Sequence, residues 1–303
     1  MTAPRAKKPR LCIFGADGFI GTHLTETLAQ TRLVKALVRK NVPAAYRNQS
    51  GVSVFRGSAG DRALLDRMIE PRDTIINLVG ATSAEARFGK LLDSHVGVQR
   101  SLLDSCARAG VKKIIFASSV AIYGSVLRPA GEDDLPRPAD DYALTKLFAE
   151  QMHEYYAGKY NIPLVILRLG SVYGTGQRKG VVYSFAQSIK NSGKIRIPKR
   201  TVYRDFVFID DVIDAIIKAM RFAGKGTDRF NIASGQKISL ARLARMAQKC
   251  VGRPISIARI GASSPDLDTA WADRRRAELA LGWKPRVSLE RGLRKTFSSY
   301  GLF

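Results

Sequence analysis

The sequence predicts an α/β fold in which a doubly wound parallel sheet is followed by a smaller C-terminal lobe. Short apolar runs alternate with amphipathic helical stretches over residues 10–173, as in repeated βαβ units. A glycine-rich turn over residues 15–21 joins the first apolar run to the first helical stretch. After Tyr173 the apolar runs become short and irregular, and glycine and proline interrupt them, which ends the regular alternation.

The elements of the first part follow one another with the short connections of right-handed crossover units. Helices are predicted where apolar residues recur three and four positions apart, and strands where short apolar runs occur. Strands are expected at Leu11–Phe14, Leu33–Val38, Val52–Phe55, Thr74–Val79, Lys113–Ala117 and Pro163–Leu169. Helices are expected at Phe19–Gln30, Arg62–Ile69, Leu91–Ala109 and Tyr142–Tyr160.

The second part is predicted to be a lobe packed on the sheet, with helices near Asp211–Phe222, Leu240–Cys250 and Leu289–Tyr300. No low-complexity linker separates the two parts. We expect the sheet domain to comprise residues 10–173, with returning segments near 205–232. The lobe is expected to comprise residues 174–204 and 233–303, and residues 1–9 to form a basic N-terminal tail.

Composition excludes several classes of protein. The chain has 303 residues, 45% of them hydrophobic and 25% charged, which is ordinary for a globular protein. It lacks an apolar run long enough to span a membrane, and its basic start lacks the hydrophobic segment of a secretory signal. The three cysteines are far apart, which predicts reduced thiols and a cytoplasmic location. The three histidines are scattered, so no metal site is predicted.

The formal net charge of +24 is high and admits three kinds of partner: nucleic acid, an anionic membrane surface or an anionic small molecule. The basic residues are spread along the chain, with short groups at residues 5–10, 194–204 and 274–276. No nucleic-acid-binding motif accompanies them. We therefore expect a solvated basic surface that steers a phosphorylated substrate, in preference to a nucleic-acid partner.

The turn Gly15-Ala-Asp-Gly-Phe-Ile-Gly21 has the spacing and the strand-to-helix context of a Rossmann dinucleotide site. The first glycine permits a tight turn, the second lets the backbone approach a pyrophosphate, and the third allows the helix to touch the strand. We expect NAD or NADP as cofactor, bound by Gly15, Asp17, Gly18, Phe19, Ile20 and Gly21.

The ends of the following strands supply further candidate cofactor contacts. Arg39 stands where NAD-selective sites carry a carboxylate, and an arginine suits the 2′-phosphate of NADP, although a solvated strand end is the simpler explanation. Asp61 either accepts from the adenine amino group or caps the next helix. Val79 and Ser118 end two later strands and are also expected to contact the cofactor.

Tyr142 and Lys146 lie four residues apart at the start of a predicted helix, so the phenol and the ammonium share one face. Tyrosine has an ordinary pKa of about 10 and is a poor base at neutral pH. A nearby ammonium and the positive charge of the nicotinamide are together expected to favour the phenolate and lower this pKa. Ser119 follows a buried strand, where its hydroxyl can bind a substrate oxygen that becomes a carbonyl. Together with the glycine turn, these residues predict a nicotinamide-dependent enzyme with Ser119, Tyr142 and Lys146 as catalytic residues.

These motifs resemble those of the extended short-chain dehydrogenase/reductases, specifically the sugar-nucleotide epimerase/dehydratase group. The resemblance extends over nearly the whole chain. It is carried by GADGFIG (15–21), SSVAIYG (118–124), YALTK (142–146), LRLGSVYGTGQ (167–177), RDFVFIDDV (204–212), FNIASGQKISL (230–240) and LGWKPRVSLERGL (281–293).

The resemblance implies a role for each site residue. Tyr142 would be the acid/base, Lys146 would bind the nicotinamide ribose and tune Tyr142, and Ser119 would hold the reacting oxygen. Arg204 would contact the phosphates or the nucleotide of a sugar-nucleotide substrate bound by the C-terminal lobe. Two copies of the chain would form a homodimer through the helices at 91–109 and 142–160.

Departures from the family pattern narrow the activity. The dehydratases carry an Asp-Glu pair where this chain has Val120 and Ala121, and sugar-acid decarboxylases carry a glutamate at the second place. Because valine and alanine transfer no proton, both reactions are disfavoured. The resemblance then implies a sugar-nucleotide 4-epimerase that works through a 4-keto intermediate, or alternatively an NAD(P)H-dependent 4-keto reductase. A non-catalytic binding protein on the same fold is a third possibility.

Four residues have less certain roles in this scheme. Ser171 replaces an asparagine that meets the diphosphate, and its hydroxyl is expected to keep an altered contact. His95 replaces a helix asparagine, and a surface or satisfied core histidine is the simpler explanation. Tyr123 either lies near the sugar or packs in the core. Arg168, at the end of a buried strand, is expected to pair with a carboxylate.

Overall fold

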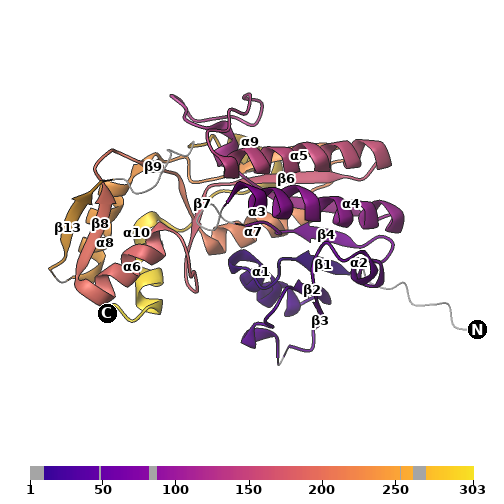
Figure 1. Ribbon diagram of the computed structural model, residues 1–303, viewed down its shortest axis with the longest axis horizontal. Coiled ribbons are helices and arrows are strands. Elements are labelled where there is room, and N and C mark those ends of the chain that lie inside the picture. The colour runs from indigo at the N-terminus through magenta and orange to yellow at the C-terminus, as the bar shows by residue number, and fades with distance from the viewer. Residues whose placement is uncertain (1–9, 48, 82–86, 253, 262–270) are drawn as a thin grey trace, which may run out of the picture.

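The computed structural model describes residues 10–47, 49–81, 87–252, 254–261 and 271–303 (Figure 1). Its centre is a seven-stranded sheet of order β11-β6-β5-β4-β1-β2-β3, in which all neighbouring strands are parallel. The strands are β1 (Leu11–Phe14), β2 (Val34–Val38), β3 (Val52–Arg56), β4 (Thr74–Asn77), β5 (Lys113–Ser119), β6 (Leu164–Leu169) and β11 (Thr227–Ile232).

The order of the strands reverses direction between β1 and β4, which pair in register from Leu11 and Thr74. Each of these two strands is buried along its whole length, as are β2 and β6. Parallel strands covered on both faces read as continuous apolar runs, which is why the sequence pattern located them. The observed topology confirms the predicted doubly wound sheet, and a crevice at such a switch point is where α/β folds bind ligands.

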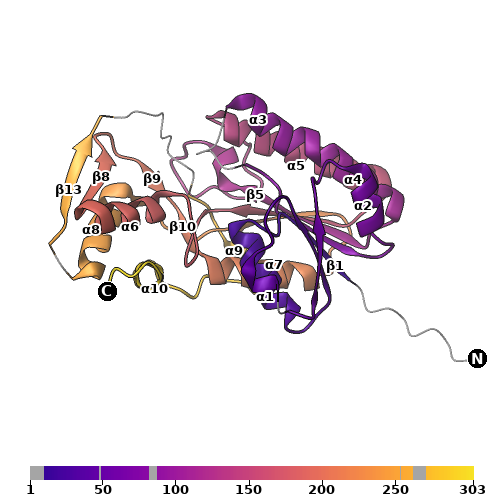
Figure 2. The ribbon, with the colours of Figure 1, turned by 60° about the horizontal axis from the view of Figure 1, so that its bottom comes forward.

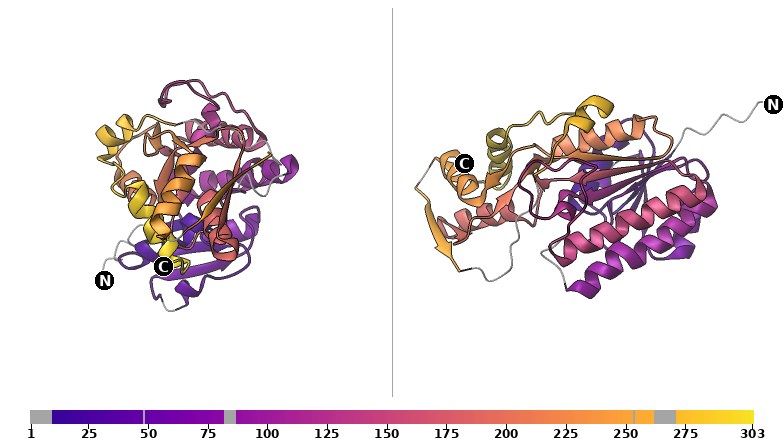
Figure 3. Two further views of the ribbon diagram at one scale, coloured as in Figure 1. Left: turned by 90° about the vertical axis from the view of Figure 1, so that its left-hand side faces the viewer. Right: turned by 90° about the horizontal axis from the view of Figure 1, so that it is seen from above.

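Helices cover both faces of the sheet (Figures 2 and 3). One face carries α1 (Phe19–Ala29) and α7 (Ile209–Arg221), which contact each other. The other face carries α2 (Arg62–Met68), α4 (Val98–Ala109) and α5 (Asp141–Tyr160), packed in that order. Each face has its own apolar cluster, so the sheet is buried between two cores.

The helix predicted at 91–109 differs in the structure. It starts earlier, as α3 (Phe88–Leu92), and is interrupted by a π turn, η3 (Asp93–Gly97), before α4 begins. A π turn inserts one extra residue and so changes which side chains face a neighbouring helix. Here the turn presents His95 to α5, where its ring nitrogen meets the Thr145 hydroxyl. Apolar periodicity carries no signal for such an inserted residue, which is why the sequence predicted one unbroken helix.

The second lobe is built on β8 (Lys194–Pro198) and β13 (Ser256–Ile260), which pair in parallel and pack against α6 (Val181–Ser192) and α8 (Leu240–Val251). The C-terminal helix α10 (Leu289–Ser299) packs on α8. Ile195 and Phe297 of this lobe belong to the same apolar cluster as Leu24 of α1. A continuous core therefore fixes the lobe to the sheet domain.

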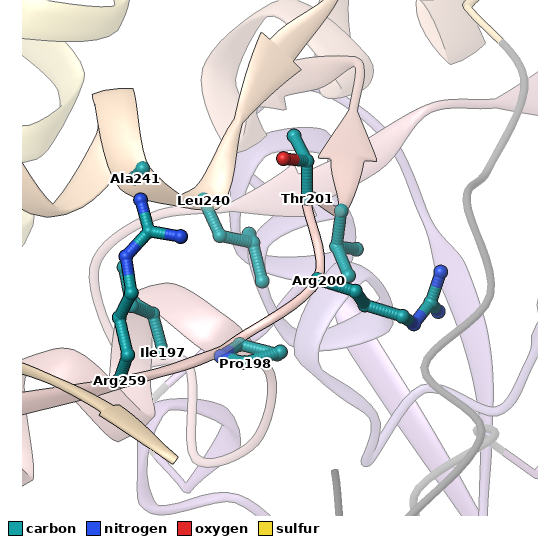
Figure 4. A pocket seen from close by; sticks show the side chains of 8 residues that line it. Ile197, Pro198, Arg200, Thr201, Leu240, Ala241 and Arg259 are labelled. Atoms are coloured by element: carbon teal, nitrogen blue, oxygen red, sulfur yellow. The ribbon is translucent and has the colours of Figure 1, made fainter. Parts of the chain in front are cut away.

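Two pairs of short strands lie between the sheet and the lobe. β7 (Ser171–Tyr173) pairs in parallel with β10 (Phe206–Phe208), and β9 (Tyr203–Arg204) pairs antiparallel with β12 (Ile238–Ser239). Within the lobe, the hollow drawn in Figure 4 lies between Pro198 and Leu240, with Arg200 and Arg259 extending in different directions. Its volume of about 10 Å³ holds a single water and no larger ligand.

The described residues include no helix with the length and apolarity to cross a membrane. In the same part of the chain, no group of histidine, cysteine and acidic side chains is arranged to hold a metal ion. Cys12, Cys106 and Cys250 are free thiols, the first two buried in the core.

Candidate active site

The candidate site lies at the carboxyl edge of the sheet, where the residues that follow β1, β4, β5 and β6 meet. In Figure 1 this edge faces the second lobe. Because all strands of the sheet are parallel, every predicted residue that follows a strand is brought to this one edge. The topology therefore gathers the glycine turn, Val79, Ser118, Ser119 and Ser171 from segments far apart in the sequence.

The glycine turn leaves no room for side chains. Gly15 has a φ of +78°, and a Cβ on it would lie 3.0 Å from the Leu78 carbonyl oxygen. A Cβ on Gly21 would overlap the Gly15 carbonyl, so helix α1 packs directly on the turn. Gly18 donates its backbone N–H to the Gly15 carbonyl at 3.0 Å and begins the helix. These are the tight turn and close approach that a dinucleotide site requires.

The N-terminus of α1 is open to an anion. No side chain caps this helix, and its first turn holds no acidic residue. The first backbone amides of a helix lack partners within it and carry partial positive charge. Phe19 and Ile20 are half-buried and pack on the apolar cluster beneath, which fixes the direction of these amides. The turn and the helix start thus fit a pyrophosphate group.

Three other predicted cofactor residues are placed around this turn. The Asp17 carboxylate accepts from the backbone N–H of Arg39 at 3.0 Å and so ties the turn to the end of β2, while the Arg39 side chain is exposed. Asp61 accepts from Leu64 N at 3.1 Å, which confirms its capping role. The backbone N–H of Val79 is held by Asn77.

The structure brings Ser119, Tyr142 and Lys146 together. Asp140 caps α5 through the Ala143 N–H at 2.7 Å and thereby fixes the helix start that carries Tyr142. The Lys146 ammonium donates to the Ala117 carbonyl of β5 at 2.9 Å, which links the helix to the strand that ends in Ser119. The Ser119 hydroxyl lies close enough to the Tyr142 phenol to lower its pKa.

The hydroxyl of Ser119 also accepts from Ala121 N at 3.2 Å, so its own proton is available to a further acceptor. Val120 and Ala121 are buried side chains and carry no titratable group. The hydroxyl of Ser118 is buried without a hydrogen-bond partner in the described part of the chain. A bound group that reaches this strand end would find that hydroxyl ready to pair.

Burial sets the electrostatics of the pair on α5. It raises the pKa of Tyr142 above its ordinary value, an effect that the Ser119 hydrogen bond opposes. Burial also lowers the pKa of Lys146 to about 8, against the attraction of Glu150. Without a bound cofactor, burial therefore outweighs any effect of Lys146 on the Tyr142 pKa. The lowering expected from the ammonium together with a positively charged nicotinamide stays a prediction. The ammonium points to the Ala117 carbonyl, and desolvation of the phenol dominates.

A buried polar network lies beside this group. Arg168 pairs with Glu150 at 2.8 Å, as predicted for a charged residue on a buried strand. The Tyr123 hydroxyl accepts from Arg168 at 2.7 Å and donates to Asn231 at 2.9 Å. With only 1% of its surface exposed, Tyr123 takes the packing role that the sequence left open, and a place near the sugar is disfavoured.

Ser171 and Arg204 lie on the short strands next to β6. Ser119 pairs in register with Leu169, two residues before Ser171, whose N–H donates to the Asp205 carbonyl at 2.7 Å. Arg204 is half-buried on β9. The buried Asp205 carboxylate accepts from backbone N–H groups of three residues and thereby holds the segment that carries Arg204.

Several polar residues near the site were not assigned a role from the sequence. Asn77 donates to Gln99 at 2.5 Å and lies 3.0 Å from His153, all three being buried. Polar residues on the inner face of a helix or at the end of an apolar strand are the signal that would have found them. Their partners lie on other elements, so the sequence could not pair them.

Comparison with known proteins follows this geometry. Residues 11–233 match the model of the NAD dependent epimerase/dehydratase family. The UDP-glucose 4-epimerase of Azospirillum brasilense is 26% identical over 94% of this chain and 90% of its own length. The dTDP-4-dehydro-6-deoxyglucose reductase of Escherichia coli is 32% identical over 63% of this chain and 62% of its own length.

Among solved structures, MoeE5 in complex with UDP-glucuronic acid and NAD superposes with a TM-score of 0.87. It is 28% identical to this chain, and the match covers 96% of this chain and 98% of that one. The sequence similarity thus extends to the arrangement of both the sheet domain and the lobe.

Proposed function

The chain belongs to the NAD dependent epimerase/dehydratase family, and from this premise we propose that it is an NAD-dependent 4-epimerase of a nucleotide-activated sugar. One observation carries the proposal: Ser119, Tyr142 and Lys146 meet at the carboxyl edge, while Val120 and Ala121 bring no acid or base beside them. Oxidation and reduction of one carbinol carbon need no further proton-transfer group. Relatives that act on UDP-sugars support the choice of substrate class.

The residues at the glycine turn fit NAD, because a pyrophosphate would find open backbone amides and no side chain in its path. Gly15, Gly18 and Gly21 would hold it, with Asp17, Phe19 and Ile20 fixing the turn. Bound NAD supplies a hydride acceptor for C4 of the sugar. Asp61, Val79 and Ser118 are proposed as further contacts to the cofactor, and Lys146 as the contact to its ribose.

The protein side chains then move one proton. We assign Tyr142 as the base that takes the proton from the C4 hydroxyl. Ser119 donates its free proton to that oxygen as it becomes a carbonyl, since Ser119 itself accepts from Ala121 N. The charged Lys146 stabilises the phenolate of Tyr142. After the 4-keto sugar has turned over and C4 has regained the hydride on its other face, Tyr142 returns the proton to the same oxygen.

The second lobe is proposed to bind the nucleotide part of the substrate. Its division from the sheet domain is proposed as residues 174–204 and 233–303 against 10–173 with 205–232. Arg204 and Ser171 would contact the diphosphate, because Ser171 follows the strand that pairs with the one carrying Ser119, and its N–H reaches the carbonyl of Asp205, the residue next to Arg204. The net charge of +24 favours an anionic substrate of this kind.

The state of the cofactor after purification tests this function. An epimerase keeps its cofactor through a reaction cycle that consumes none. We expect NAD to survive dialysis and UDP-hexoses or UDP-hexuronic acids to be converted without added cofactor, with the C4 epimer identified by proton NMR. The proposal would be contradicted if the protein consumed NADPH stoichiometrically with a 4-keto sugar nucleotide and formed no epimer.

That second outcome would identify a 4-keto reductase, the alternative favoured by the similarity to the Escherichia coli reductase. The exposed Arg39 bears on the same question, since it could bind the 2′-phosphate of NADP. Arg39→Asp should shift the preference toward NAD, measured as the ratio of the two dissociation constants. An unchanged ratio would show that Arg39 is surface charge only.

We further propose that the protein is a cytoplasmic homodimer. Phe148 and Tyr155 are exposed on α5 and lie seven residues apart, which places them on one stripe of the helix. Helices α4 and α5 pack side by side, and the stripe lies exposed on α5. Such an exposed apolar stripe suits the two-fold interface of a homodimer. The free thiols of Cys12 and Cys106 suit a reducing compartment.

A further inference from the structure

His95 is a buried residue beside the proposed catalytic pair, and the mechanism above does not use it. Its side chain is completely buried in the π turn η3. The ring lies edge-on to that of Tyr142, with 5.7 Å between the centroids. One ring nitrogen is satisfied and the other is not: no described atom makes a well-aligned hydrogen bond with Nε2.

The neighbouring hydroxyl favours one of the two tautomers of the His95 ring. His95 Nδ1 lies 2.9 Å from the Thr145 hydroxyl. Thr145 already donates its own proton within α5, to the Asp141 carbonyl at 2.9 Å. With its proton donated there, the hydroxyl accepts from His95. We assign the proton to Nδ1 on this basis, which leaves Nε2 as an acceptor. A buried acceptor without a partner costs free energy unless a donor reaches it.

The Lys146 ammonium is a donor that borders the same space as Nε2. A Cβ built on Gly80 would lie 2.6 Å from His95 Nε2 and 3.2 Å from Lys146 Nζ, so both nitrogens border the same space above this glycine. The ammonium has three protons, and one of them is donated to Ala117. The pKa of His95 is lowered to about 3, first by burial and second by the positive charge of Lys146.

We propose that His95 is a positioning residue for Lys146, whose ammonium it binds through Nε2 either directly or through one water. This inference rests on the proposed function only for the role of Lys146. The neutral imidazole stabilises the charged form of Lys146 and directs it across the space above Gly80. An asparagine amide in this place would keep the bond to Thr145, but it is too short to reach the position of Nε2.

Several titratable groups lie around Lys146 in the described part of the chain. Tyr142, Glu150 and His153 come from its own helix, and His95 comes from the π turn. Glu150 is held by Arg168, and His153 is engaged by Asn77 and the Ala149 carbonyl. Among these groups, His95 therefore offers an unoccupied acceptor, Nε2, to the ammonium.

The opposite tautomer gives the competing arrangement. The Ala81 backbone lies close enough to His95 to raise its pKa, as an accepting carbonyl does. In that case Nε2 would carry the proton and donate it toward Ala81, and it could not accept a hydrogen bond from Lys146. Nitrogen-15 chemical shifts of the histidine ring distinguish the two tautomers in the wild-type protein without any substitution.

The test combines that measurement with the pKa of Lys146, followed by carbon-13 NMR of ε-labelled lysine and assigned with Lys146→Arg. In His95→Leu we expect the Lys146 pKa to fall by about 1, the size of one lost hydrogen bond. His95→Asn should behave like the leucine variant. His95→Gln, whose amide oxygen reaches the position of Nε2, should keep the wild-type pKa.

A protonated Nε2, or a Lys146 pKa unchanged in both His95→Leu and His95→Asn, would overturn the proposal. If the leucine variant fails to fold, the tautomer of the wild-type protein and the Lys146 pKa in the asparagine and glutamine variants still test the proposal. The NMR measurements need no substrate. Failure to find an epimerase substrate would therefore count against the proposed function and leave this inference standing.

Discussion

At the scale of single residues, desolvation shapes the two titratable groups of the candidate site, the buried Lys146 and the half-buried Tyr142. Lys146 keeps its charge in a buried position at the cost of a lower pKa, and Tyr142 is held in its neutral form by the same burial. Each shift favours the uncharged state, as desolvation does. A bound positive charge next to the phenol would oppose this shift for Tyr142.

Replacing Tyr142 by phenylalanine tests its role as the base. Tyr142→Phe keeps the ring and removes only the hydroxyl, and turnover should fall by roughly two orders of magnitude or more, as when a positioned acid/base is lost. Steady-state kinetics on the epimerisation reaction measure this. Tyr155→Phe, on the exposed part of the same helix, is the matched control and should leave turnover unchanged.

A loss smaller than about threefold would contradict the assignment, because general acid–base catalysis contributes far more. Retention of the biological activity by Tyr142→Phe would instead favour a binding protein without catalysis on this fold.

The pH dependence of the reaction tests the role of Lys146. Its pKa in the folded protein is about 8, below the ordinary value of lysine, so the ammonium is lost as the pH rises through 8. If the charge is needed, kcat/KM declines above this pH. Lys146→Arg keeps a positive charge at higher pH and should retain a reduced activity without that decline. A profile with the same alkaline limb in both proteins would assign the limb to another group.

At the scale of elements, two contacts join helices to the sheet at the site. Helix α1 begins on the glycine turn, where Gly21 touches the Gly15 carbonyl. Helix α5 is tied to β5 by Lys146 and to β6 by the buried pair of Glu150 and Arg168. The first contact shapes the cofactor site, and the second holds the helix that carries Tyr142.

Adding one methyl group to the turn tests the first contact. Gly21→Ala places a Cβ against the Gly15 carbonyl and must push α1 away from β1. We expect lost retention of NAD, measured by the absorbance of the cofactor released on denaturation, together with a lower melting temperature. Gly89→Ala in α3 is the matched control, since its Cβ would meet no atom within 4 Å. Full retention of NAD in Gly21→Ala would contradict the placement of the pyrophosphate.

Breaking the buried ion pair tests the second contact. Glu150→Ala leaves the Arg168 guanidinium buried without its carboxylate, which should lower the free energy of unfolding by about 3–5 kcal/mol. Glu154→Ala removes the half-exposed partner of Arg229 from the same helix and should cost no more than about 1 kcal/mol. Urea unfolding of the two variants gives the comparison. Equal losses would show that burial does not govern the stability of these pairs.

At the scale of the whole molecule, charge and exposed apolar surface determine how the protein meets other molecules. The excess of 24 positive charges is spread over both parts of the chain, which favours steering of an anionic ligand over one nucleic-acid-binding face. The apolar side chains exposed on α5 form a separate feature, since the opposite side of this helix is buried against β5 and α4.

The proposed dimer is tested on that surface. Phe148 and Tyr155 have 38% and 62% of their surface exposed. A charge at either position should dissociate a dimer formed through α5, because it would be buried without a partner. Sedimentation velocity on Phe148→Glu and Tyr155→Glu should show monomers, whereas Leu127→Glu, at a fully exposed loop position, should remain dimeric. A monomeric wild-type protein would exclude the dimer.

Local patterns were sufficient to predict six of the seven strands of the sheet and most helices, whereas β11 was expected only as part of a returning segment. The strands could be found because parallel strands buried on both faces are continuously apolar, and the α1 start because only glycines tolerate that turn. The spacing of Tyr142 and Lys146 was sufficient to place both on one helical face. The π turn before α4 was not predictable, since its extra residue is fixed by a contact with α5.

The sequence by itself determined the fold class, the position of the glycine turn and the pairing of Tyr142 with Lys146, because each depends on backbone geometry within a few residues. Only the tertiary structure decided the electrostatics. The raised pKa of Tyr142, the enclosure of Tyr123 by Arg168 and Asn231, and the open nitrogen of His95 all depend on neighbours far away in the sequence. Desolvation and hydrogen bonding are set by what surrounds a group in space, and the order of residues does not contain that information until the chain is folded.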